Sequence, residues 1–108
     1  MKTKTKALKH YDRMIKWAEK QKPRERLSFN FKGYHRMQKE LGEHWGGVYC
    51  PYCTNLKETG NRLCPLTKNN CFGFNCCEGL WGKMRGSKTW GTWVKRAKLV
   101  REYIRENG

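Results

Sequence analysis

All six cysteines of this 108-residue chain lie between residues 50 and 77, where the apolar residues follow neither a helical nor an alternating pattern. An apolar core is therefore not expected to hold this stretch. The lysine-rich start of the chain has no apolar segment after it, which predicts neither a secretory leader nor a membrane span. Thiols of a cytoplasmic protein bind metal more often than they form disulfides. We therefore expect a cytoplasmic protein with a structural zinc site.

The cysteine spacing indicates which thiolates hold the ion. Zn²⁺ takes four nitrogen or sulfur ligands in a tetrahedron, and the turn Cys50-Pro51-Tyr52-Cys53 delivers two of them. A hairpin tip at residues 59–61 would return Cys64 beside Cys53, as a third ligand. Cys77 precedes a short helical start at residues 78–81 and is the predicted fourth ligand, since a helix N-terminus favours a thiolate. The alternates for that position are Cys76, Cys71 and His44.

Other interpretations of the cysteines are disulfides, an iron–sulfur cluster and plain buried thiols. A zinc ion with four protein ligands has no open position for water, so the predicted site orders the chain and activates no nucleophile. The three histidines are scattered, Asp12 is the only aspartate, and no known catalytic motif is present. We therefore predict that the protein is not an enzyme.

Outside the cysteine-rich stretch, apolar residues at helical spacing predict three main helices. These helices cover residues 5–21, 34–45 and 87–106, and the alternation in residues 27–31 suits a short strand. The five tryptophans lie on the helical stripes and are expected in the core. We predict a mainly α single domain over residues 1–108. It comprises a basic helical part (1–47), a cysteine-rich zinc-binding part with a short hairpin (48–86) and a C-terminal amphipathic helix (87–108).

The charge of the chain is strongly one-sided. Lysine and arginine total 24 against 9 acidic residues, a net charge of +15. Although a charged face is usually only solvated, an excess of this size is typical of proteins that meet a polyanion. We predict nucleic-acid contacts from the outer faces of the first and last helices. The predicted residues are Lys9, Arg13, Lys16, Lys20, Lys95, Lys98, Arg101 and Arg105.

Aromatic residues near the cysteines suggest a second kind of contact. Tyr52 lies within the CxxC turn, and we predict that its ring stacks on an unpaired base. The alternative is that Tyr52 and its aromatic neighbours cover the metal.

The motifs Cys50-Pro51-Tyr52-Cys53, Cys64-Pro65-Leu66 and Cys76-Cys77-Glu78-Gly79-Leu80-Trp81, followed by an amphipathic helix, resemble a group of small, uncharacterised, phage-encoded Cys-rich proteins. The resemblance covers about residues 48–106, and residues 1–47 have no counterpart in it. It implies a structural zinc site and expression in an infected bacterium, and it implies no established activity.

Two functions are consistent with these features. The first is a small, basic, zinc-stabilised binding protein that contacts DNA or RNA with weak sequence preference and regulates host processes. The second is a protein–protein inhibitor of a bacterial nucleoprotein or defence complex, similar to an anti-CRISPR protein, whose basic side chains occupy the place of nucleic acid. Binding to bare oligonucleotide at physiological salt distinguishes the two.

Overall fold

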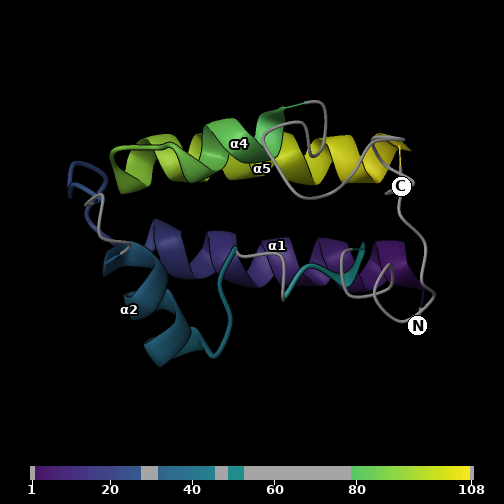
Figure 1. The fold of residues 1–108 in the computed structure, drawn as a ribbon, viewed down its shortest axis with the longest axis horizontal. Coiled ribbons are helices and arrows are strands. Elements are labelled where there is room, and N and C mark those ends of the chain that lie inside the picture. Colours follow the sequence, from purple (N-terminus) through teal and green to yellow (C-terminus); the bar gives the residue numbers. More distant parts are fainter. Residues whose placement is uncertain (1, 28–31, 46–48, 53–78, 108) are drawn as a thin grey trace.

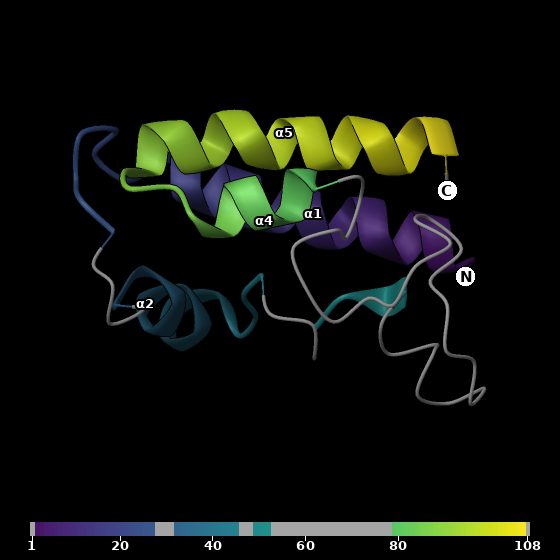
Figure 2. The ribbon, with the colours of Figure 1, turned by 45° about the horizontal axis from the view of Figure 1, so that its top comes forward.

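A computed structural model describes residues 2–27, 32–45, 49–52 and 79–107 of the chain. These residues form the helices α1 (Thr3–Glu19), α2 (Lys32–Leu41), α4 (Leu80–Arg85) and α5 (Trp90–Asn107). Helices α1 and α5 lie side by side and run in opposite directions, while α4 packs along α5 and α2 contacts α1 (Figures 1 and 2). The predicted mainly α class is confirmed, with four helices in the described residues instead of three main ones.

Helix α1 begins two residues earlier than predicted. Its N-cap is Lys2, whose side chain makes no capping hydrogen bond, and Thr5, the predicted first residue, lies inside the helix. The Lys6 N–H donates to the Lys2 carbonyl at 3.0 Å and closes the first turn. The buried face consists of Ala7, His10, Tyr11, Met14, Ile15 and Ala18.

Helix α2 ends at Leu41, four residues before the predicted end at Trp45. Gly42 has a φ of 85°, in the left-handed region that glycine adopts without strain, and its N–H donates to the Gln38 carbonyl at 2.9 Å. Trp45 therefore reaches the core from a non-helical segment that follows Gly42.

The core takes residues from all four described helices, with Met37 from α2, and is built around tryptophans. The predicted stripe of α5 is confirmed, because Trp90, Trp93, Ala97, Val100 and Ile104 are all buried. The Trp45 ring lies 5.4 Å from Trp93, and the Trp17 ring lies edge-on to Trp90 at 5.2 Å between ring centroids. Trp17 and Trp81 are only partly buried, and the indole N–H of Trp81 donates to the Trp45 carbonyl at 3.0 Å.

The predicted strand at residues 27–31 falls mostly outside the described residues. Just before it, Arg26 forms an isolated antiparallel bridge with Thr89, and Leu27 packs partly buried against the core. Within the described ranges, no helix is both long and apolar enough to cross a membrane.

Candidate nucleic-acid interface

One face of α1 carries a continuous row of cations. Exposed basic residues follow one another at spacings of four and three, which places them on a single stripe. With a rise of about 1.5 Å per residue, the stripe is about 27 Å long. Its members are Lys2, Lys6, Lys9, Arg13, Lys16 and Lys20. The first two were not predicted, since the helix was expected to start at Thr5, but the same spacing extends back to them.

Arg13, although it lies on this stripe, already has an anionic partner. Its Nε donates to Oε1 of Glu43 at 2.7 Å and its Nη2 donates to Oε2 at 3.0 Å. This two-pronged pair ties α1 to the segment that follows α2. Burial alone would raise the pKa of Glu43, but the Arg13 hydrogen bonds and the nearby His10 and Arg13 charges outweigh it and lower this pKa. Arg13 therefore stabilises the fold through its pair with Glu43.

The two predicted arginines of α5 are also paired. Arg101 Nη1 lies 2.9 Å from Oδ1 of Asp12, which links α5 to α1, and Arg105 pairs with Glu102 one turn earlier on its own helix. Lys95 and Lys98, in contrast, are exposed and make no ion pair among the described residues.

The Asp12–Arg101 pair shows how the basic faces of α1 and α5 meet. Lys9 and Lys16 lie three residues before and four residues after Asp12, so all three share one face of α1. On α5, Lys98 and Arg105 stand in the same relation to Arg101. Because Asp12 and Arg101 touch, the lysines on both helices flank one seam. The structure thus brings together the two basic faces that the sequence analysis treated separately.

A division between the two cation types runs through the described residues. Every ion pair there is made by an arginine or by His10, and none by a lysine. Other arginines are engaged differently. Arg96 donates to the Lys83 carbonyl at 2.8 Å, and the guanidinium of Arg85 lies 5.8 Å from the Trp81 ring centroid. Arginine suits such fixed contacts because its planar fork loses less freedom for each bond formed.

Of the four predicted zinc ligands, Cys50 alone lies in the described residues, and of the alternates His44 alone does. Cys50 is 8% exposed and belongs to the apolar core cluster, next to Pro51 and Tyr52. The remaining cysteines, Cys53, Cys64, Cys71, Cys76 and Cys77, lie outside the described residues, so the predicted ligand set stays a prediction. Within the described ranges, no three His, Cys, Asp or Glu side chains are grouped to hold a metal ion. A buried thiol at the start of a CxxC turn fits the donor chemistry that Zn²⁺ prefers.

Tyr52 is 6% exposed and packs in the same core cluster. A ring with this little exposure presents no face on which a base can stack. Tyr52 is therefore left out of the proposed phosphate contacts, and the alternative, that it covers the metal, stays a prediction.

Two buried histidines add no charge to this surface. His10 Nδ1 lies 3.4 Å from Oε2 of Glu43; burial lowers the pKa of His10, although the Glu43 charge opposes the shift. His44 lies between the rings of Tyr34 and Tyr49, and burial, with smaller contributions from the charges of His10 and His35, lowers its pKa to about 4. Both imidazoles are therefore neutral near pH 7.

Comparisons of this chain with protein families, with curated proteins and with solved structures found no match. The proposals below therefore rest on the residues and contacts already described.

Proposed function

We propose that this protein binds nucleic acid through phosphate contacts made by the exposed lysines of α1 and α5. The residues that carry the contacts are Lys9, Lys16, Lys20, Lys95 and Lys98, with Lys2 and Lys6 extending the row on α1. The observation that supports this function is the division of cations: within the described residues, every carboxylate in an ion pair binds an arginine, and none of these lysines has an anionic partner there.

The position of the lysines also indicates how nucleic acid would be recognised. Helix α1 is packed against α5 on one side and α2 on another. Only one stripe of α1 is therefore accessible, and the helix cannot insert as a whole into a groove. Lysines on such a stripe contact phosphates, and phosphate contacts position a protein without reading bases. The expected binding is weak in sequence preference and strongly dependent on salt.

The cysteine turn has a structural role in this proposal. Cys50 and Cys53 begin a zinc site completed by Cys64 and Cys77, and the ion supplies the folding free energy that the stretch lacks in apolar residues. The wider role that we propose is that of a phage-type regulator acting on host nucleic acid in the bacterial cytoplasm.

A salt titration tests the proposal. Fluorescence anisotropy with a labelled 20-base-pair DNA duplex, the matching single strand and an RNA of the same length gives the dissociation constant at several salt concentrations. We expect the logarithm of the binding constant to fall linearly with the logarithm of salt concentration. The slope should be about −0.9 per phosphate contact on the duplex and about −0.7 on single strands.

The opposite result would favour the inhibitor. If no oligonucleotide binds at 100 mM salt, while a single bacterial protein is retained from a nuclease-treated lysate, the basic surface serves a protein partner. Sequence-dependent binding with a flat salt response would also contradict the proposal.

A further inference from the structure

A second basic surface lies at the end of the helix pair, where α1 ends and α5 begins. The chain leaves α1 at Lys20 and turns at residues 22–25, where the Glu25 N–H donates to the Lys22 carbonyl at 3.0 Å. Pro23 at the second position presets this turn. Five cations are exposed here, and we call them the end cluster: Lys20, Lys22, Arg24, Arg26 and Lys88. Among them, Lys20 alone was predicted from the sequence.

Backbone hydrogen bonds hold the two segments of the end cluster together. The Leu27 N–H donates to the Lys88 carbonyl at 2.8 Å, and the Gly91 N–H donates to the Pro23 carbonyl at 2.9 Å. The Trp90 N–H, at the start of α5, donates to the Glu25 carbonyl at 3.3 Å. The first amides of α5 are therefore occupied by the turn, and the positive end of this helix fixes the turn instead of binding a ligand.

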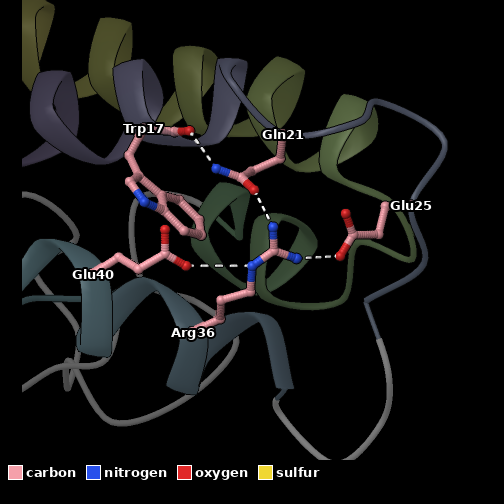
Figure 3. A network of polar contacts seen from close by, with 5 residues as sticks. All are labelled: Trp17, Gln21, Glu25, Arg36 and Glu40. Atoms are coloured by element: carbon pink, nitrogen blue, oxygen red, sulfur yellow. Dashed lines mark hydrogen bonds and ion pairs between the residues drawn. The ribbon is translucent and has the colours of Figure 1, made fainter.

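The acidic residue of the turn, Glu25, is paired with an arginine of α2. Arg36 donates to the carboxylate of Glu25 and to the amide oxygen of Gln21, and its Nε lies 3.4 Å from Glu40 (Figure 3). Its guanidinium also lies over the Trp17 ring, 6.0 Å from the centroid. Since Glu25 is the sole acidic residue in residues 20–27 and already pairs with Arg36, the four cations of this segment carry a local excess of positive charge.

Arg24 and Arg26 differ from the other arginines of the described chain. Six others bind a carboxylate, a backbone carbonyl or an aromatic ring, whereas these two guanidinium groups are exposed and have no partner among the described residues. A guanidinium fork binds two oxygens of one phosphate, which a lysine ammonium does not. The fold thus presents two guanidinium groups without partners, Arg24 on the turn and Arg26 just after it, where its backbone bridges to Thr89.

We propose that Arg24 and Arg26 form a phosphate clamp that grips the nucleic-acid backbone, with Lys22 and Lys88 beside it and the α1 lysines continuing from Lys20. This inference rests on the proposed function, because a phosphate clamp has a role only if the protein binds nucleic acid. It adds a contact point at the end of the helix pair. The two arginines anchor one end of the bound strand, and the lysine stripe follows it along α1.

Paired variants test the clamp with the full-length protein. Arg24→Gln/Arg26→Gln is compared with Lys39→Gln/Lys83→Gln, which removes the same charge from exposed positions on α2 and α4. On the 20-base-pair duplex at 100 mM salt, we expect the arginine variant to bind about tenfold more weakly or worse, and its salt slope to be shallower by about 1.8, two contacts of about 0.9 each. The Lys39→Gln/Lys83→Gln control should change the affinity less than threefold.

A third variant distinguishes the geometry of the guanidinium group from its charge. Arg24→Lys/Arg26→Lys keeps both charges, and we expect it to recover part but not all of the affinity, because an ammonium cannot make the two-pronged contact. Circular dichroism should show unchanged thermal unfolding in all three variants. If the wild type binds and the arginine variant matches the Lys39/Lys83 variant, the clamp is wrong and the lysine stripe still stands. If the wild type binds no oligonucleotide, the proposed function and the clamp both fall.

Discussion

Arg13 and Glu43 face each other across 30 residues of sequence, with both carboxylate oxygens of Glu43 taken by one guanidinium. His10, one turn earlier on α1, approaches the same carboxylate to 3.4 Å. Glu43 thereby anchors the residues 42–45 that follow α2, from which Trp45 enters the core. A residue that sequence analysis assigned to nucleic acid is in this way part of the scaffold.

Replacing this carboxylate should destabilise the protein in a pH-dependent manner. We expect Glu43→Gln to lower the free energy of unfolding by about 1 kcal/mol near pH 7. The substitution removes the negative charge, while the remaining amide oxygen can still accept one hydrogen bond from Arg13. The folded-state pKa of Glu43 is lowered, so its contribution is fully present above the ordinary pKa and disappears as pH falls through the lowered value.

Urea unfolding at pH 7 and at pH 3 measures this contribution. The difference between wild type and Glu43→Gln should shrink at pH 3. A difference that is the same at both pH values would show that the substitution acts by repacking and not through the ion pair.

The buried histidines predict a loss of stability at moderately acidic pH. The pKa of His44 is lowered to about 4 and that of His10 is lowered as well, so the unfolded chain binds protons that the folded chain does not. Stability from the neutral imidazoles is present above the ordinary pKa near 6.5 and is lost as pH falls below it. For His44 the slope should approach about 1.4 kcal/mol per pH unit between pH 6 and 5.

His44→Phe keeps an aromatic ring between Tyr34 and Tyr49 and removes the titrating group. Its unfolding free energy, followed by intrinsic tryptophan fluorescence in urea, should depend less on pH than that of the wild type over the same interval. Parallel curves for the two proteins would contradict the assignment of this slope to His44.

Gly91 permits the turn at residues 22–25 to close on α5. A Cβ at this position would lie 3.1 Å from the Pro23 carbonyl oxygen and 3.3 Å from its Cβ. Crowding of this kind costs about 1–3 kcal/mol, against about 1 kcal/mol gained by alanine in a helix. We therefore expect Gly91→Ala to be less stable by about 1 kcal/mol in urea unfolding.

Gly86→Ala is the matched control. Its added Cβ meets the Gly82 oxygen at an ordinary 3.4 Å and its φ of −81° suits any residue. This control should stay within about 0.5 kcal/mol of the wild type. A Gly91→Ala protein as stable as the control would mean that the turn yields without cost.

The zinc prediction is tested on protein purified without added metal. We expect one zinc ion per chain, and we expect Cys53→Ser to lose folding or solubility while Cys71→Ser is mild, because losing a ligand removes metal-linked folding free energy. Elemental analysis and circular dichroism give the two readouts. Two zinc ions, a visible iron chromophore, or equal effects of the two substitutions would show that the ligand set is wrong.

Local patterns in the sequence predicted the helices well and their contacts poorly. The stripe from Trp90 to Ile104 was predictable because burial on one face repeats at the helical period. The end of α2 was missed because Gly42 was not weighed as a stop and Trp45 happens to continue the spacing. The pairing of Arg101 with Asp12, 89 residues away, depends on how α5 docks on α1, which no local pattern contains.

Local patterns were also insufficient to predict which residues are free to contact nucleic acid, as we propose. Periodicity identified Lys9, Lys16 and Lys20, whereas the engagement of Arg13 required the position of Glu43 in the fold. Arg24 and Arg26, which we propose as the clamp, were not predicted because they lie outside any amphipathic stripe.

We propose that arginines of α1 and α5 stabilise the fold through ion pairs, while the neighbouring lysines contact phosphate. The direct measurement compares Lys9→Gln/Lys16→Gln/Lys20→Gln with Arg13→Gln/Arg101→Gln, recording duplex affinity against salt and the free energy of unfolding for each. We predict that the lysine variant keeps its stability and has a salt slope shallower by about 2.7, from three contacts of about 0.9. The arginine variant should lose about 1–3 kcal/mol of stability and, once folded, keep the slope. A lysine variant with wild-type affinity and slope would contradict the account.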